Sequence, residues 1–331
     1  MLTFSQMLKI LKKPVAVKSY LLLATCLIAA NAIQASAEEA GVTGTTIQIG
    51  GVMDLNGASK GLGLGMKAGI EAALNGEKIQ NRSIKLVVLN DYYTPTETVK
   101  ATQQLINQGI FLMLGNVGTP TAKVALPILA TNKVPAVGFF TGADLLRPGV
   151  GDIINFRASY VQEIATTVET ALAAGVKPQE ICAFVQNDAY GMAGISGLKV
   201  ALAKQPGMAE TISKLEQILA MPGEEPARNN VGPVGVYLRN GKIVREGYLS
   251  LKQWEKTANA HCRLIVTVGT YAPIADFIGY SRLKGDNWVV SAVSFTGTDY
   301  LLKAVETYKI TNGVIITNVV PSLDSSLPIV E

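Results

Sequence analysis

The sequence contains almost no histidine and little cysteine. Its single histidine, His261, stands beside Cys262, one of only three cysteines in 331 residues. A lone histidine gives neither a Ser-His-Asp set nor a zinc-ligand spacing. CxxC, HExxH and Walker motifs are also missing from the sequence. These absences argue against an enzyme, and we predict no catalytic residue, no cofactor and no metal site.

Charged residues are scarce and balanced. They make up 16% of the chain against 48% hydrophobic residues, which excludes a disordered protein and supports large buried cores. The net charge of +4 arises from the first 37 residues, which carry four lysines and no acid. The rest of the chain has 25 basic and 25 acidic residues. A nucleic-acid-binding protein is expected to have a basic face, so we expect no nucleic-acid partner.

Residues 1–37 have the pattern of a secretory signal peptide. A basic segment is followed by an apolar run at about 20–30, and small residues precede the expected cleavage site after Ala37. The apolar run is shorter than the ~20 residues that a membrane anchor needs. Acylation at Cys26 is the other alternative, but Cys26 lies inside the apolar run. We therefore expect an exported, periplasmic protein.

Export permits a disulfide between the two remaining cysteines, Cys182 and Cys262. Each lies at the start of an apolar segment that is typical of a buried strand. If these strands are neighbours in a parallel sheet, their starts come together. We hypothesise a disulfide, and the alternative is two buried thiols.

Apolar runs alternate with amphipathic segments along most of the chain. This β-α alternation predicts an α/β fold with parallel sheets and right-handed crossovers, and 331 residues suffice for two Rossmann-like lobes. Strands are expected at 46–53, 84–89, 111–114, 135–139, 153–157, 181–186, 264–268, 288–293 and 313–320. Helices are expected at 66–74, 95–108, 121–131, 162–174, 196–203, 248–258, 274–284 and from 299 onward.

Two segments depart from this alternation. Residues 234–244 contain Asn240-Gly241, which favours a type I′ turn and predicts a β-hairpin. Glycines alternate with leucines at 61–65, after a strand and before a helix. They resemble a dinucleotide-binding loop, but Met66 occupies the place of its third glycine. We interpret these glycines as a tight loop that lines a cleft.

A pair of loop signatures occurs twice in the same order. Gly118-Thr119 and Thr141-Gly142 follow apolar runs in the first half of the chain. Gly269-Thr270 and Thr296-Gly297 follow apolar runs in the second half. The threonines are 22 residues apart in the first pair and 26 in the second. This repetition indicates two related halves whose loops face each other across a cleft.

In open parallel sheets, ligands bind beyond the carboxyl ends of the strands. Hydroxyl groups, aromatic rings and free backbone amides at these positions suit a small polar or zwitterionic solute. The alternative is that Thr119 and Thr141 only cap helices. The predicted ligand-binding residues are Thr119, Thr141, Gly142, Tyr190, Tyr271, Ser294 and Thr296.

Between Thr46 and Val320, several short motifs resemble those of type I periplasmic solute-binding proteins. The resemblance is to the leucine/isoleucine/valine-binding family, the receptors of ABC importers. It implies that Thr119 and the Thr141-Gly142 loop bind a ligand carboxylate, and that Tyr190 and Tyr271 close over the ligand. It also implies an inner-membrane ABC permease as the partner. The motifs are Gly118-Thr119-Pro120-Thr121, Val134-Pro135, Phe156-Arg157-Ala158-Ser159, Asp188-Ala189-Tyr190-Gly191 and Gly269-Thr270-Tyr271-Ala272-Pro273.

The sequence departs from the family pattern at one functional position. Amino-acid binders of the family have an acid for the ligand ammonium where this chain has Ala292-Val293-Ser294. Glu163 is a candidate substitute for that acid. An amino acid, an amide and a short carboxylate therefore stay open as ligands. The alternatives to a transport function are a periplasmic sensor that feeds a signalling receptor and an exported hydrolase.

The resemblance also suggests a division of the chain. Residues 38–155 would form the first lobe and 156–320 the second. Residues 321–331 would begin the return crossing to the first lobe. Family members add further elements after that crossing, so we expect a C-terminal part of the first lobe to be missing here.

Overall fold

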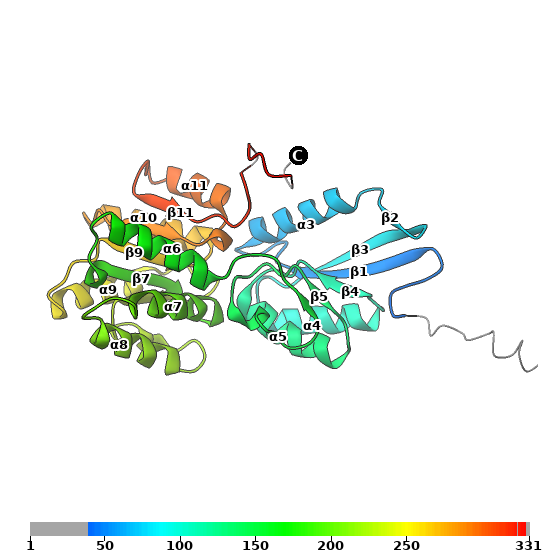
Figure 1. Cartoon of the computed structure of the whole chain (residues 1–331), viewed down its shortest axis with the longest axis horizontal. Helices are drawn as coiled ribbons and strands as arrows, with labels where there is room; N and C mark the ends of the chain where they lie inside the picture. Colours follow the sequence, from blue (N-terminus) through cyan, green and yellow to red (C-terminus); the bar gives the residue numbers. More distant parts are fainter. Residues whose placement is uncertain (1–38, 323, 329–331) are drawn as a thin grey trace, which may run out of the picture. The chain divides into compact units, whose positions relative to one another are not determined.

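A computed structural model describes residues 39–322 and 324–328, and two mostly parallel sheets form its frame (Figure 1). The predicted signal peptide and its cleavage site lie outside the described residues. Within the described ranges, no helix combines the length and apolar character needed to span a membrane.

The first sheet has the strand order β2-β3-β1-β4-β5-β6. Only the short β2 runs antiparallel to its neighbour. Helix α3 lies on one face of the sheet, and α4 and α5 lie on the other (Figure 1). We call this sheet with its helices the first lobe. Its elements are β1 (Thr46–Met53), α3 (Lys60–Leu74), β2 (Lys78–Ile79), β3 (Arg82–Asn90), α4 (Pro95–Asn107), β4 (Leu112–Leu114), α5 (Thr119–Thr131), β5 (Ala136–Val137) and β6 (Ile153–Ile154).

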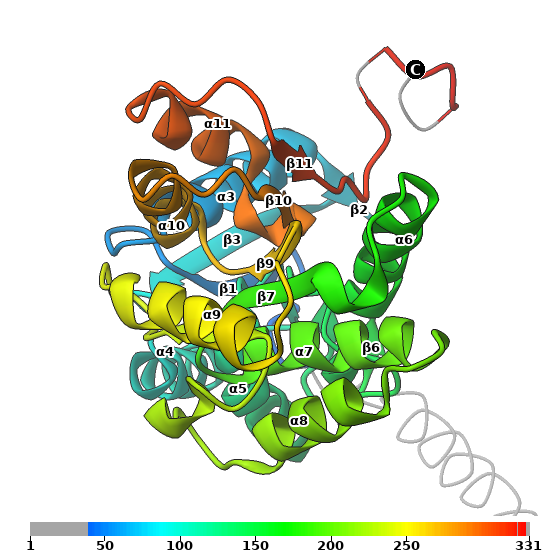
Figure 2. The ribbon, with the colours of Figure 1, turned by 90° about the vertical axis from the view of Figure 1, so that its left-hand side faces the viewer.

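The second sheet is fully parallel and has the order β11-β10-β9-β7-β8. Helices α6, α7 and α8 lie on one side of it, and α9, α10 and α11 lie on the other (Figure 2). We call this sheet with its helices the second lobe. Its elements are α6 (Tyr160–Ala173), β7 (Ile181–Gln186), α7 (Ala189–Leu202), α8 (Ala209–Ala220), β8 (Val234–Tyr237), α9 (Arg245–Thr257), β9 (Leu264–Val268), α10 (Tyr271–Leu283), β10 (Val289–Ala292), α11 (Thr298–Glu306) and β11 (Val314–Ile316).

The two sheets repeat one topology. If β2 is set aside, the first sheet runs β3-β1-β4-β5-β6 and the second runs β8-β7-β9-β10-β11. In both sheets the first strand of the lobe lies between the second and the third. The predicted two-lobed α/β fold is confirmed, and the repeated topology agrees with the repeated loop signatures. The domain boundaries at 155 and 320 stay a prediction.

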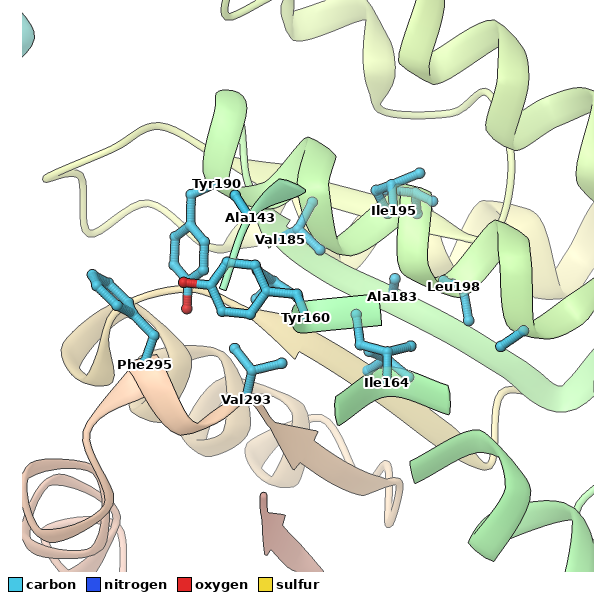
Figure 3. Packing of buried hydrophobic residues seen from close by; sticks show 14 of the residues in the cluster. Ala143, Tyr160, Ile164, Ala183, Val185, Tyr190, Ile195, Leu198, Val293 and Phe295 are labelled. Carbon is cyan, nitrogen blue, oxygen red and sulfur yellow. The ribbon is translucent and has the colours of Figure 1, made fainter. Parts of the chain in front are cut away.

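A buried hydrophobic cluster contains residues of both lobes. Every residue of β7 and of β9 is buried, as the apolar runs predicted. The cluster includes Met53 and Tyr93 from the first lobe. From the second lobe it includes Tyr190, Val293 and Phe295 (Figure 3). Burial of apolar surface at about 25 cal/mol per Å² makes this cluster a main source of stability.

The second lobe contains a disulfide between Cys182 and Cys262, with the two Cα atoms 5.7 Å apart. Cys182 is the second residue of β7, and Cys262 comes two residues before β9. These two strands pair in parallel, which brings their starts together.

The predicted hairpin at 234–244 is wrong. Strand β8 pairs with β7 in parallel, and the chain then turns into α9. Asn240 has a φ of +59° and the Gly241 N–H donates to the Leu238 carbonyl, so a turn does form there. A Cβ on Gly235 would lie 2.1 Å from the Gly247 carbonyl oxygen, so α9 packs directly on β8. After the turn the chain therefore continues into α9 and not into a second hairpin strand.

The glycines at 61–65 are helical, so their interpretation as a loop is wrong. Helix α3 begins at Lys60 rather than at Met66. A Cβ on Gly63 would lie 2.0 Å from the Asp54 carbonyl oxygen, and one on Gly61 would lie 2.7 Å from the Tyr300 ring. Glycine therefore allows the start of α3 to pack closely against the loop after β1 and against the second lobe.

Candidate ligand-binding site

The candidate site lies where the strand order of each sheet reverses. In the first lobe this point is between β1 and β4, and in the second it is between β7 and β9. The connections that leave the two central strands go to opposite faces of the sheet, which opens a crevice at their carboxyl ends. Thr119 follows β4, and Tyr271 follows β9.

On the first lobe, Thr119 and Thr141 form one hydroxyl pair. Their Oγ1 atoms are 2.6 Å apart, and both side chains are buried. The Thr141 hydroxyl also accepts from the Ala143 N–H at 3.2 Å. Helix α5 begins at Thr119, with Gly118 at its N-cap and no side-chain cap. Neither threonine caps a helix, so the capping alternative is wrong.

Two glycines let aromatic rings approach this hydroxyl pair. Gly118 has a φ of +112°, and a Cβ there would lie 2.3 Å from Cε2 of Tyr93. A Cβ on Gly142 would lie 2.7 Å from Cδ1 of Tyr160. Positive φ and ring contact together require glycine at position 118.

The Gly118→Ala variant should therefore be destabilised by about 3 kcal/mol, because it combines backbone strain with overpacking. Gly69→Ala is a matched control, because Gly69 is a helical glycine of α3 with open space at its Cβ. That control should gain up to about 1 kcal/mol. Urea denaturation of both variants measures their difference in stability. Equal urea midpoints would contradict the requirement for glycine at position 118.

On the second lobe, Tyr190 is enclosed by other aromatic rings. It is fully buried, and its hydroxyl donates to the Gly269 carbonyl at 3.3 Å. Its ring centroid lies 4.8 Å from that of Phe295 and 5.3 Å from that of Tyr160 (Figure 3). Burial raises the pKa of the Tyr190 phenol well above its ordinary value, so the group is neutral at physiological pH.

Tyr271 contacts both lobes. Its hydroxyl donates to the Ala58 carbonyl of the first lobe at 3.1 Å. Its ring stacks on Tyr300 with centroids 5.1 Å apart and packs against the cluster that contains Tyr190 and Phe295. Tyr271 thus connects the loop after β1 to the start of α10.

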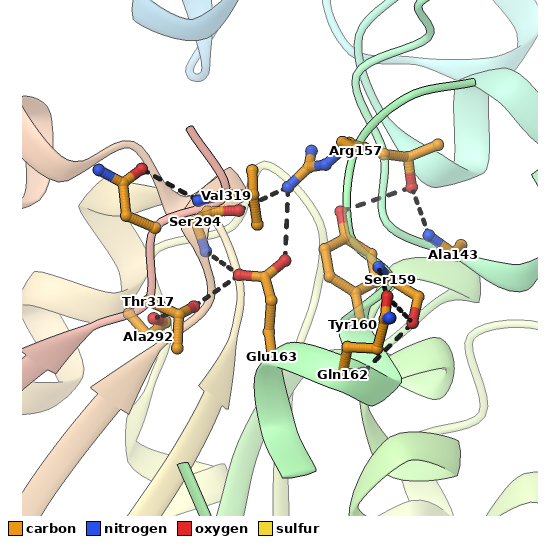
Figure 4. Close-up of polar contacts among 12 residues, drawn as sticks. Ala143, Arg157, Ser159, Tyr160, Gln162, Glu163, Ala292, Ser294, Thr317 and Val319 are labelled. Carbon is orange, nitrogen blue, oxygen red and sulfur yellow. Dashed lines mark hydrogen bonds and ion pairs between the residues drawn. The ribbon is translucent and has the colours of Figure 1, made fainter. Parts of the chain in front are cut away.

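Ser294 and Thr296 follow β10, and Ser294 belongs to a polar network (Figure 4). The Ser294 N–H donates to Oε2 of Glu163 at 2.7 Å, and its hydroxyl accepts from Nη2 of Arg157. The Thr317 hydroxyl, just after β11, donates to the same Oε2 atom. Thr296, two residues after Ser294, is fully buried.

Glu163 has a different role from the one suggested by the sequence. Nη2 of Arg157 lies 3.4 Å from Oε1 of Glu163, and both side chains are buried. Its other oxygen accepts from Ser294 and Thr317. Both carboxylate oxygens are bound to protein groups, which argues against Glu163 as the acid for a ligand ammonium.

Sequence reasoning missed the aromatic residues that line the site. Phe140 and Phe295 lie on different lobes with ring centroids 4.8 Å apart. Tyr93 lies 6.4 Å from Phe295 by the same measure, and its hydroxyl accepts from Nε2 of Gln186 at 3.1 Å. Phe140 and Phe295 directly precede Thr141 and Thr296, two of the predicted ligand-binding residues. This adjacency was the sequence signal that could have identified them. An aromatic residue after a strand is more often part of the core, so the pattern alone did not identify them.

Comparison with known proteins places the chain among periplasmic binding proteins. A family model described as periplasmic binding protein matches residues 46–211. A structure from Rhodopirellula baltica, described as a possible leucine/isoleucine/valine-binding protein, is 33% identical, with a TM-score of 0.74 over 86% of this chain and 72% of that one. No curated protein sequence matches the chain.

Two further structures share the fold at lower identity. A substrate-binding periplasmic protein from Ralstonia solanacearum is 24% identical, with a TM-score of 0.66 over 86% of this chain and 74% of that one. A solute-binding protein of an ABC transporter from Rhodopseudomonas palustris, in complex with p-hydroxybenzoic acid, is 17% identical, with a TM-score of 0.59 over 79% of this chain and 65% of that one.

Proposed function

Because the chain belongs to the periplasmic binding protein family, whose members are binding proteins rather than enzymes, we propose that it is the solute-binding component of an ABC importer. The family implies a periplasmic location, and cleavage of a signal peptide after Ala37 is part of this proposal. Its partners are a small polar solute and an inner-membrane ABC permease. The candidate solutes are an amino acid, an amide or a short carboxylate.

One observation carries the proposal: the two strand-reversal points meet in a single buried cluster. Phe140 of the first lobe touches Phe295 of the second, and Tyr271 bonds to Ala58 across the lobes. Hydroxyl groups from both lobes lie beside these rings. A solute held here would contact both lobes, so its binding would favour the closed arrangement. The permease would then recognise the closed protein.

The predicted contact residues are Thr119, Thr141 and Gly142 on the first lobe, and Tyr190, Tyr271, Ser294 and Thr296 on the second. The hydroxyl pair of Thr119 and Thr141 supplies donors and acceptors in a buried setting, where hydrogen bonds to a solute discriminate strongly. The neutral phenol of Tyr190 adds a ring face and a hydroxyl group.

A thermal-shift screen of amino acids, amides and short carboxylates tests the proposal. A solute at 100 times its Kd should stabilise the protein by about 2.7 kcal/mol through mass action. Thr119→Ala and Tyr271→Phe should each weaken binding of that solute by roughly tenfold, because each removes one hydrogen bond from the site or its closure. Isothermal titration calorimetry measures the change.

Tyr308→Phe is the matched control for Tyr271→Phe. The Tyr308 hydroxyl donates to Asp276 within the second lobe at 2.6 Å, so its loss leaves the contact between the lobes intact. Unchanged affinity in both Thr119→Ala and Tyr271→Phe would place the solute elsewhere on the molecule.

A further inference from the structure

In the part of the chain that the structure describes, every buried carboxylate is engaged by the protein's own groups. Asp54 accepts from the backbone N–H groups of the loop that follows it. Asp91 accepts from Tyr93 and Thr98. The buried acidic side chains among the described residues are Asp54, Asp91, Glu163, Asp188 and Glu255.

The remaining acids are engaged in the same way. Asp188 accepts from the Tyr190 N–H at 2.9 Å and from Nε of Arg239 at 3.0 Å. Glu255, on α9, accepts from the Cys262 N–H at 2.9 Å. Glu163 accepts from three protein groups, as described above. Among residues 39–322 and 324–328, no buried acid is therefore left over for a ligand ammonium.

The buried cations behave differently. Arg228 uses all three guanidinium nitrogens, including a bond from Nη1 to Oδ1 of Asn187 at 2.7 Å. Arg157 uses only Nη2, which donates to Glu163 and Ser294. Its Nε and Nη1 atoms are buried without a partner. These two atoms carry three of the five N–H donors of the group.

Arg157 lies at the aromatic part of the candidate site. Its guanidinium carbon is 4.9 Å from the centroid of the Phe140 ring and 5.8 Å from that of Tyr160. Phe140 in turn contacts Phe295 across the lobes. The bond to Ser294 fixes the guanidinium group beside the loop after β10 (Figure 4). Donors that are buried without a protein partner are costly, so an acceptor from a ligand fits there.

We propose that the site selects a carboxylate solute that has a flat apolar body and lacks an ammonium group, with the carboxylate bound by Arg157. This inference rests on the proposed function and narrows its solute class. The carboxylate would accept from Nε or Nη1 of Arg157, and such charge-assisted bonds are strong. The rings of Phe140, Tyr160 and Phe295 would pack on the apolar body. An ammonium group would be buried without a counter-charge, which disfavours amino acids.

Matched pairs of solutes test the selection. The pairs are 3-phenylpropanoate with L-phenylalanine and 4-methylpentanoate with L-leucine, which differ only by the ammonium group. Calorimetry on the mature protein should give the carboxylate of each pair a Kd at least 100-fold lower than that of the amino acid. Within the carboxylates, 3-phenylpropanoate should bind about tenfold more tightly than 4-methylpentanoate.

Substitutions test the role of Arg157. Arg157→Gln should weaken 3-phenylpropanoate binding by at least 100-fold, and Arg157→Lys should recover part of that loss because it keeps the charge but not the planar donors. Lys123→Gln is the control, because it removes the same charge from an exposed position on α5. That control should change the Kd by less than twofold.

A second variant guards against misfolding of Arg157→Gln, which leaves Glu163 without its partner. The double variant Arg157→Gln/Glu163→Gln removes both charges and keeps two polar side chains of similar shape. It should fold and should still fail to bind the carboxylate.

The outcomes separate the two proposals. Tighter binding of the amino acid in each pair, or carboxylate binding that survives in the folded double variant, would overturn the carboxylate selection and leave the solute-binding function intact. If neither this panel nor the wider thermal-shift screen gave any binding, both proposals would be contradicted.

Discussion

Replacing Glu163 by Ala should lower the free energy of unfolding by about 3–5 kcal/mol, the usual cost of removing one partner from a buried ion pair. The side chain is 3% exposed and faces Arg157, which is 5% exposed. The same carboxylate accepts from Ser294 and Thr317, so it ties α6 to the ends of β10 and β11. Its loss would leave the Arg157 charge buried and two further donors unsatisfied. Urea denaturation followed by circular dichroism measures the change.

Two variants calibrate this result. Glu163→Gln keeps an acceptor for Ser294 and Thr317 but loses the charge, so it should cost less than Glu163→Ala. Glu169→Ala removes an exposed acid from the same helix and should stay within about 0.5 kcal/mol of the unmodified protein. If Glu163→Ala unfolded at the same urea concentration as Glu169→Ala, the network would have no structural role.

Replacing both Cys182 and Cys262 by Ala should cost about 4 kcal/mol. The disulfide joins residues 80 apart in sequence, and closing a loop of that length restricts the unfolded chain strongly. Alanine is the suitable replacement because both positions are buried, where a serine hydroxyl would need a partner. The variant should melt well below the unmodified protein in a calorimetric scan.

Reduction provides the control for this prediction. Dithiothreitol should bring the melting temperature of the unmodified protein down toward that of the double variant, whose own melting temperature should not change. Mass spectrometry without reductant should find Cys182 and Cys262 in one linked pair of peptides. Two free thiols, or a melting temperature insensitive to reductant, would contradict the predicted stabilisation.

Features that depend on neighbouring residues were visible in the sequence. The buried strands β7 and β9 are mostly apolar runs, with Gln186 and Thr267 as their only polar residues, since a parallel sheet covered on both faces excludes water from every side chain. The positions of the cysteines at the starts of these strands suggested their pairing. The repeated Gly-Thr signatures indicated two related halves, because loops that follow equivalent strands need similar turns.

Features that depend on distant residues were not visible. Helix α8 was not predicted, although it buries Thr211, Leu215 and Ile218 on one side. The hairpin prediction failed because the packing of α9 on β8 outweighed the local preference of Asn240-Gly241 for a hairpin turn. Local propensity is a weak guide where tertiary contacts compete with it.

The sequence by itself determined the periodicity of burial, and therefore the α/β class, the two lobes and the loops that carry the candidate site. Only the tertiary structure decided which hydrogen-bond donors and acceptors of the charged side chains are already used. Glu163 and Ser294 are 131 residues apart, and Glu163 and Thr317 are 154 apart. The sequence gives the polarity of each side chain. The partners that folding brings near that side chain decide whether its donors and acceptors are satisfied. For that reason the sequence alone offered Glu163 as a partner for a ligand ammonium. Arg157 became a candidate for binding a carboxylate only when the partners of its guanidinium nitrogens were known.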